Sequence, residues 1–169
     1  MKFETLEIAR EGSVATIWMN RPDVHNAFNE ALIADLTAAC EALDADDSVR
    51  AVVLAGRGKS FSAGADLNWM RRAADASVEE NIADARKLAG MLRTLAEMHK
   101  PTIARVHGAA LGGGMGLASA CDICIAGEGA VFATSEVKFG IIPSAISPYV
   151  IRAIGARQAG RYFQTAERI

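Results

Sequence analysis

The sequence predicts an α/β domain with a mainly parallel sheet. The mainly apolar run at 49–55 and the short segment at 102–106 are typical of strands buried in parallel sheets. Residues 29–43 carry apolar side chains at helical spacing. Strand-like and helix-like segments then alternate, which is the order that βαβ units produce. We therefore expect one α/β domain over residues 1–169.

The first elements are bounded by clear turn signals. Residues 3–9 and 13–19 alternate or run apolar on either side of a Glu-Gly pair, so they predict a β-hairpin. A loop at 20–23 contains a proline and ends the second strand. Asn29 is suited to cap the helix that follows. Its predicted core-facing residues are Leu32, Ile33, Leu36, Ala39, Cys40 and Leu43.

The remaining elements follow the same alternation of apolar runs and glycine-containing or polar loops. After a polar turn at 44–48 comes the buried strand 49–55 and a Gly/Ser loop at 56–64. The later expected elements are helices at 65–74 and 78–99, a strand at 102–106, a glycine-rich segment at 108–116, a helix at 117–120, strands at 123–126 and 131–135, a loop at 139–143, and helices at 147–154 and 156–165.

Composition narrows the class of protein. Hydrophobic residues make up 51% and charged residues 22%, which suits a packed core. A net charge of -2 does not favour nucleic-acid binding. Apolar stretches are broken well before the ~20 residues of a membrane helix, and the N-terminus lacks the apolar region of a signal peptide. Three cysteines suit reduced thiols, so we expect a cytoplasmic protein.

Several familiar motifs are incomplete. The Gly-Lys-Ser at 58–60 lacks the first glycine of a phosphate-binding loop, because that position is Val53. Glycines 112 and 114 match the start of a dinucleotide-binding motif, but the third glycine of that motif is replaced by Leu117, so the motif is incomplete. Cys121 and Cys124 have no second pair or nearby histidine, so buried structural cysteines are expected. The three histidines lack partners at metal spacing, and no metal site is predicted.

Two glycine-containing turns, 61–67 and 112–114, each follow a strand and open into a helix. Free N–H groups at such turns can donate to a developing negative oxygen, with help from the helix dipole. The two turns could converge on one carbonyl oxygen, or serve only tight strand–helix packing. Glu136 lies in an otherwise apolar stretch at 135–143, where its pKa should rise and it could act as an acid or base. A capping or surface glutamate is the alternative.

These motifs together resemble the crotonase (enoyl-CoA hydratase/isomerase) superfamily over nearly the whole chain. The matching segments are Asn20-Arg21-Pro22, 26–28, 61–67, 108–114, Cys121-Asp122, Ser135-Glu136 and 140–143. The resemblance implies a ββα-spiral core with mainly parallel sheets that binds acyl-CoA thioesters. Coenzyme A would be part of the substrate, so no separate cofactor is implied.

The resemblance also assigns roles to individual residues. The N–H groups of Ala65 and Gly113 would form an oxyanion hole for the thioester oxygen, and Glu136 would be the second of the two glutamates that hydratases use. The residues expected beside the substrate or its CoA part are Asn26, Ala27, Phe28, Ala63, Asp66, Leu67 and Gly116.

Gly116 stands where the family places its first glutamate. A single carboxylate suits a Δ3,Δ2-enoyl-CoA isomerase, which moves a proton between C2 and C4. However, segments 66–70, 113–117 and 142–150 resemble the methylglutaconyl-CoA hydratase-like branch, which is associated with leucine and isoprenoid catabolism. We therefore expect an enoyl-CoA hydratase acting on a 2-enoyl-CoA, with 3-methylglutaconyl-CoA as a candidate substrate. The isomerase and a non-catalytic acyl-CoA binder are the alternatives.

Family chains usually continue beyond the length of this one. By that comparison, the C-terminal helices that complete the acyl pocket and form trimer contacts are expected to be missing from residues 1–169. Apolar surface near 147–165 would then need cover. The resemblance implies a homotrimer or a hexamer, with no nucleic-acid or membrane partner.

Overall fold

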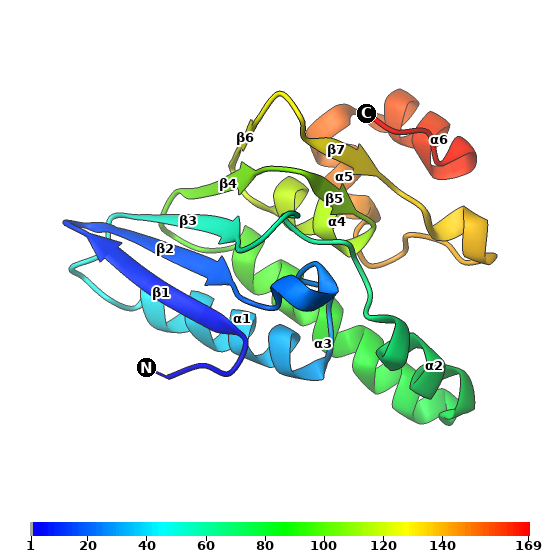
Figure 1. Ribbon diagram of the computed structural model, residues 1–169, viewed down its shortest axis with the longest axis horizontal. Coiled ribbons are helices and arrows are strands. Elements are labelled where there is room, and N and C mark those ends of the chain that lie inside the picture. The colour runs from blue at the N-terminus through cyan, green and yellow to red at the C-terminus, as the bar shows by residue number, and fades with distance from the viewer. Residues whose placement is uncertain (1) are drawn as a thin grey trace.

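The computed structural model describes residues 2–169 as an α/β fold with two sheets (Figure 1). A five-stranded sheet has the order β1-β2-β3-β4-β6, and a two-stranded sheet pairs β5 with β7. Only β1 and β2 are antiparallel, which confirms the predicted α/β class with mainly parallel pairing. The strands are β1 Leu6–Glu11, β2 Val14–Met19, β3 Ala51–Gly56, β4 Thr102–Val106, β5 Ala109–Leu111, β6 Ile123–Ala126 and β7 Val131–Ala133.

Six α-helices and two short 3₁₀ helices complete the part of the chain that the structure describes. The α-helices are α1 Glu30–Asp44, α2 Leu67–Asp75, α3 Val78–Ala96, α4 Gly113–Ala120, α5 Ser147–Ile154 and α6 Ala156–Thr165. The 3₁₀ helices are η1 Pro22–Val24 and η2 Glu136–Phe139. Over residues 2–169, no helix combines the length and apolar character needed to cross a bilayer.

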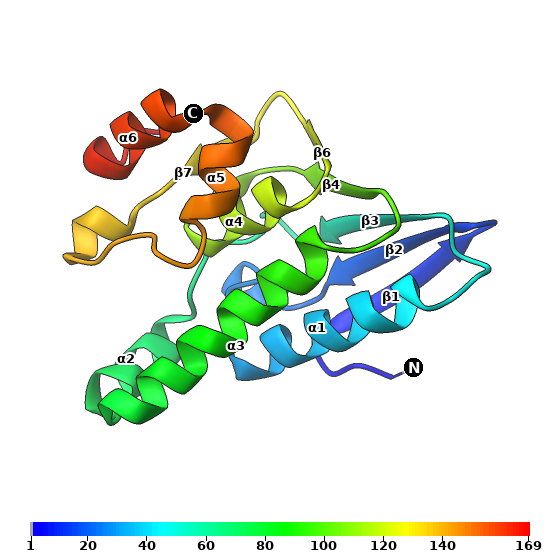
Figure 2. The ribbon, with the colours of Figure 1, turned by 180° about the vertical axis from the view of Figure 1, so that it is seen from behind.

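Helices α1 and α3 cover one face of the large sheet (Figure 2). The Asn29 side chain caps α1 by accepting a hydrogen bond from the Leu32 N–H at 2.9 Å, and all six predicted core-facing residues of this helix are buried. Ser77 and Glu80 form a capping box at the start of α3, and its C-terminal turns bury Met91, Leu92 and Leu95. This packing makes a rigid platform for the loops at the carboxyl ends of the parallel strands.

Three predictions about local structure need correction. The glycine-rich segment contains a strand, β5, and α4 begins at Gly113 rather than at residue 117. Phe139, the first residue of the predicted loop at 139–143, ends a 3₁₀ helix, η2. Cys124 is exposed instead of buried, because β6 is the edge strand of the large sheet and all four of its residues are exposed. Cys40 and Cys121 are buried as expected.

Candidate active site

A cavity of about 760 Å³ opens between α2, the turns at 63–66 and 111–113, and the segment 135–146. Val24, His25, Ala27 and Phe28 complete its wall. The segments come from distant parts of the sequence and meet at the carboxyl-terminal side of the parallel strands, where α/β folds place their ligands. Most of the wall is apolar, and the polar groups in it are few enough to be considered one by one.

The first glycine-containing turn is held between two neighbouring segments. Phe28 N–H donates to the Gly64 carbonyl at 2.7 Å, and Asp66 N–H donates to the Phe28 carbonyl at 2.8 Å. On the other side, Leu111 N–H donates to the Ser62 carbonyl at 2.9 Å. These strand-like bonds fix the direction of the peptide between Gly64 and Asp66, and therefore the direction of the Ala65 N–H.

The two predicted turns are in contact. Gly64 adopts a φ of +90°, and a Cβ there would lie 2.8 Å from the Leu111 carbonyl oxygen and 3.6 Å from the Gly113 nitrogen. Only glycine permits this conformation and this approach. Within residues 2–169, neither the Ala65 N–H nor the Gly113 N–H donates a hydrogen bond, and both residues line the cavity. The structure thus brings together two free donors, one of them at the N-terminus of α4.

Gly113 is packed against Phe28. A Cβ at Gly113 would lie 2.5 Å from Cε2 of the Phe28 ring, which is only 1% exposed. The turn into α4 is made by Gly112, with a φ of +50°, and the Gly112 N–H donates to the Ala133 carbonyl at 2.8 Å. Glycine at position 113 therefore allows the helix N-terminus to reach the cavity beneath an aromatic ring.

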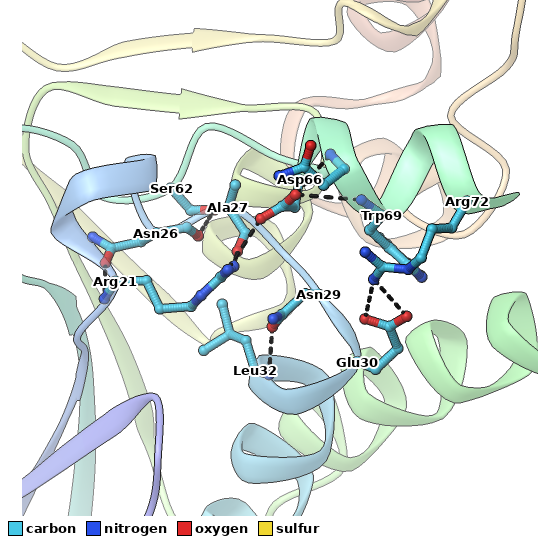
Figure 3. A network of polar contacts seen from close by, with 11 residues as sticks. Arg21, Asn26, Ala27, Asn29, Glu30, Leu32, Ser62, Asp66, Trp69 and Arg72 are labelled. Atoms are coloured by element: carbon cyan, nitrogen blue, oxygen red, sulfur yellow. Dashed lines mark hydrogen bonds and ion pairs between the residues drawn. The ribbon is translucent and has the colours of Figure 1, made fainter.

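Asp66 organises the start of α2 (Figure 3). Its Oδ1 accepts hydrogen bonds from the N–H groups of Asn68 at 2.8 Å and Trp69 at 3.3 Å. Its Oδ2 pairs with Arg21 Nη2 at 3.0 Å, and Arg21 also donates to the Ala27 carbonyl. Burial raises the pKa of the Asp66 carboxyl, but these donors outweigh it and hold the pKa below its usual range.

Asn26 does not line the cavity, although the sequence placed it beside the substrate. Its side chain is fully buried, and its Oδ1 accepts a hydrogen bond from the Arg21 N–H at 2.9 Å. Its Nδ2 donates to the carbonyls of Arg57 and Ser60, both at 2.9 Å. The amide is occupied by backbone groups, so its role in this structure is to shape the loop that carries Ala27 and Phe28.

Glu136 lies at the start of η2 and contributes to the cavity wall. A Cβ at Gly112 would lie 3.2 Å from its Oε1, so the carboxyl sits beside the glycine turn. Its Oε2 is buried and has no hydrogen-bond partner within residues 2–169. Burial raises the pKa of the Glu136 carboxyl, as the apolar sequence around it predicted. The burial of Oε2 does not fit a fully solvated surface glutamate.

Gly116 is also absent from the cavity wall, and Ile146 lies there instead. A Cβ at Gly116 would lie 2.3 Å from Cγ2 of Ile146, so this isoleucine covers the α-carbon of the glycine. The expectation that Gly116 contacts substrate needs correction, because Ile146 separates it from the cavity. Helix packing alone explains glycine at this position.

The other predicted residues, Ala27, Ala63 and Leu67, line the cavity. Sequence reasoning assigned no role to Arg21, Trp69 or Ile146. Each of the three lies within a segment that carries the family resemblance, and that resemblance is the only feature of the sequence that points to them. Their contacts join segments 30 or more residues apart, such as Arg21 with Asp66 and Gly116 with Ile146.

Comparison with known proteins agrees with this fold. The family model described as enoyl-CoA hydratase/isomerase matches residues 9–169. The chain therefore belongs to the enoyl-CoA hydratase/isomerase family, and the predicted crotonase resemblance is confirmed. A solved structure of an enoyl-CoA hydratase from Shewanella pealeana superposes with a TM-score of 0.96 at 46% identity, covering 99% of this chain and 63% of that one.

Curated relatives show the same relation. A Rhizobium meliloti protein named "Probable enoyl-CoA hydratase" is 41% identical over 174 residues, covering 99% of this chain and 66% of the relative. The 2,3-dehydroadipyl-CoA hydratase of Escherichia coli is 36% identical over 165 residues, covering 97% and 63%. The chain thus spans less than two thirds of the length of these relatives.

Proposed function

We propose that the protein binds acyl-CoA thioesters and hydrates 2-enoyl-CoA substrates. The observation that carries this proposal is the meeting of two free N–H groups, from Ala65 and Gly113, with the unpartnered Glu136 carboxyl at one cavity. The donors suit an oxygen that gains negative charge, and the carboxyl suits proton transfer. Membership of the enoyl-CoA hydratase/isomerase family supports the same reaction class.

The proposed mechanism uses one carboxylate for both proton steps. The N–H groups of Ala65 and Gly113 polarise the thioester carbonyl, which makes Cβ of the enoyl group electrophilic. Glu136 takes a proton from water as the water oxygen bonds to Cβ, and the electron pair of the double bond moves to form an enolate. The enolate oxygen rests on the two N–H groups until Glu136 returns the proton to Cα. Losing one such donor typically costs about 2.7–4 kcal/mol in barrier height.

For the acyl group, we propose 3-methylglutaconyl-CoA as the substrate to test first. The segments 66–70, 113–117 and 142–150 support it through their resemblance to the methylglutaconyl-CoA hydratase-like branch. The Escherichia coli relative is named for a substrate whose acyl chain likewise ends in a carboxylate. Assembly into a homotrimer or hexamer is a further proposal, supported by the family resemblance and by the exposed Ile123 and Ile125 on the edge strand β6.

One observation favours an isomerase as a second candidate. Glu136 faces the cavity without a second carboxyl at position 116, and Ile146 fills the space there. A single base can remove a proton from C2 of a 3-enoyl-CoA and return it to C4 through the same stabilised enolate. This reaction needs no activated water.

Product mass separates these functions. The full-length protein is incubated with crotonyl-CoA, 3-methylglutaconyl-CoA and 3-hexenoyl-CoA. The gain of one water on a 2-enoyl substrate is the expected result. A migrated double bond in 3-hexenoyl-CoA at unchanged mass, with no hydration of the other two, would establish the isomerase instead. Binding without turnover, in the wild type and in Glu136→Gln alike, would make the protein a non-catalytic acyl-CoA binder.

A further inference from the structure

Two buried side-chain polar atoms within residues 2–169 have no hydrogen-bond partner, Nε1 of Trp69 and Oε2 of Glu136. Both residues line the same cavity. An unpaired buried N–H is costly, so such groups are rare and call for an explanation. The carboxyl has its explanation in the proposed chemistry. The indole N–H has none within the mechanism, and a ligand that accepts its hydrogen bond would remove the cost.

Trp69 is held firmly by its surroundings. Its backbone N–H donates to Asp66 Oδ1 in the first turn of α2, and Asp66 is fixed in turn by Arg21 (Figure 3). The indole is partly buried and packs against the hydrophobic core. A donor carried by a capped helix and packed against the core is already oriented before a ligand arrives, which is what specific recognition requires.

The missing partner must be an acceptor, because an indole N–H can only donate. The thioester oxygen is already served by Ala65 and Gly113, so the acceptor has to be a different oxygen. Trp69 belongs to the part of the wall that α2 forms, whereas Gly113 belongs to α4 and Glu136 to η2.

Charge favours a carboxylate as that acceptor. Arg71 and Lys138 line the cavity and form no ion pair within residues 2–169. The Asp66 carboxylate is balanced by Arg21. Apart from Glu136, the uncompensated charges of the wall are therefore positive, and they would attract an anionic group at the far end of an acyl chain.

We propose that Trp69 is a specificity-determining residue whose indole N–H donates to a carboxylate at the distal end of the acyl chain. This inference rests on the proposed binding of enoyl-CoA thioesters. It gives the dicarboxylic substrate proposed above a recognising residue: Trp69 would favour enoyl-CoA thioesters with a distal carboxylate over those of simple alkyl acids.

The test is substrate selectivity in Trp69→Phe, which keeps an aromatic ring and removes the N–H. The measured quantity is kcat/KM for glutaconyl-CoA divided by kcat/KM for crotonyl-CoA, using the full-length protein. The ratio should fall about 10- to 100-fold, mainly through KM for glutaconyl-CoA, because hydrogen bonds to charged groups are among the stronger ones. Trp18→Phe, on β2 and outside the cavity, is the matched control and should leave the ratio unchanged.

An unchanged ratio in Trp69→Phe would overturn the inference. Equal losses on both substrates would also overturn it, since they would show a structural role or a contact with the CoA part. If the wild type hydrates crotonyl-CoA, the proposed function stands whatever the Trp69→Phe variant shows. If neither substrate is turned over by the wild type, the proposed function fails instead.

Fluorescence gives a second measurement that does not need the Trp69 variant to fold. In Trp18→Phe, Trp69 is the remaining tryptophan of residues 1–169, so the measurement uses this segment of the protein. Its emission should shift when glutaryl-CoA binds and should not shift with butyryl-CoA, which lacks the distal carboxylate. Binding of glutaryl-CoA without a shift, or identical shifts with both thioesters, would contradict the hydrogen bond.

Discussion

Cγ2 of Ile146 occupies the space directly beside the α-carbon of Gly116, 2.3 Å from where a Cβ would be. Ile146 is only 3% exposed, and it lies at the start of α5 while Gly116 lies within α4. The contact therefore joins two helices and also closes off the place where related hydratases are expected to carry a glutamate. The Gly116–Ile146 contact thus both packs α4 against α5 and leaves no room for a second carboxyl at position 116.

The first prediction concerns this pair. In an open helix, replacing glycine by alanine gains roughly 0.5–1 kcal/mol. Here Gly116→Ala should instead lower the free energy of unfolding by about 1–3 kcal/mol, because the new methyl group overlaps Ile146. Ile146→Ala alone should also destabilise the fold, because Ile146 is buried, but the double variant should lose less than the sum of the two single losses, since the overlapping methyl group is gone. Urea unfolding of both single variants and the double variant measures the coupling.

Gly160→Ala in α6 is the matched control, because a Cβ there meets nothing within 4 Å. It should leave the stability unchanged or raise it slightly. Strictly additive effects of Gly116→Ala and Ile146→Ala would contradict the steric account. For the same reason, Gly116→Glu alone should not supply a second catalytic carboxyl, since its side chain cannot pass Ile146.

The second prediction concerns the Glu136 carboxyl, whose Oε2 is buried in the cavity wall without a partner within residues 2–169. Glu136→Gln keeps the shape of the side chain but removes the proton acceptor, so kcat should fall about 10²- to 10⁴-fold. Binding of a saturated acyl-CoA should be nearly unchanged, because the two backbone donors remain. Isothermal titration and steady-state kinetics measure the two effects. Glu128→Gln, an exposed carboxylate in the turn after β6, is the control, and an equal loss of activity there would contradict the assignment.

The third prediction follows from the raised pKa of Glu136. As a base, this group must lose its proton, so the acidic limb of kcat/KM should lie above the ordinary glutamate value of 4.5. The folded state holds the proton more tightly than the unfolded state, so the group contributes stability below pH 4.5 that is lost as pH rises through the folded pKa. Glu136→Gln should therefore be more stable than the wild type at neutral pH.

This difference in unfolding free energy should shrink below the ordinary pKa, where both proteins carry a neutral side chain. Urea unfolding at pH 4 and pH 7.5 provides the comparison. A Glu136→Gln variant less stable than the wild type at pH 7.5 would show that the carboxylate has a stabilising partner.

Much of the fold could be predicted from the sequence where periodicity and caps are strong. The bounds of α5 and α6 are those predicted from the sequence, and Asn29 caps α1 as expected. The start of α4 and strand β5 could not be predicted, because a run of glycine carries no side-chain periodicity. There the backbone is set by partners distant in sequence, such as the Ala133 carbonyl that receives the Gly112 N–H.

The candidate site divides in the same way. The two glycine turns and Glu136 could be found because their chemistry is visible in the residue types themselves. Two other features could not be predicted from the sequence: Ile146 separates Gly116 from the cavity, and the Asn26 side chain turns toward backbone carbonyls. Both depend on packing between separate segments. A short polar side chain in a motif can contact a ligand or hold a loop, and local spacing does not distinguish the two.

The last prediction concerns Asp66, which both caps α2 and neutralises Arg21. Asp66→Ala should lower the unfolding free energy by about 2–4 kcal/mol, because it removes a cap and leaves a partly buried guanidinium unpaired. Asp66→Asn keeps an acceptor for the cap and should cost less. Since the Asp66 pKa is lowered, the wild-type advantage should be present at neutral pH and disappear as pH falls below the usual aspartate range. Urea unfolding at pH 7 and pH 3 checks this, with exposed Asp75→Asn as control; equal costs for Asp66→Ala at both pH values would rule out the ion-pair contribution.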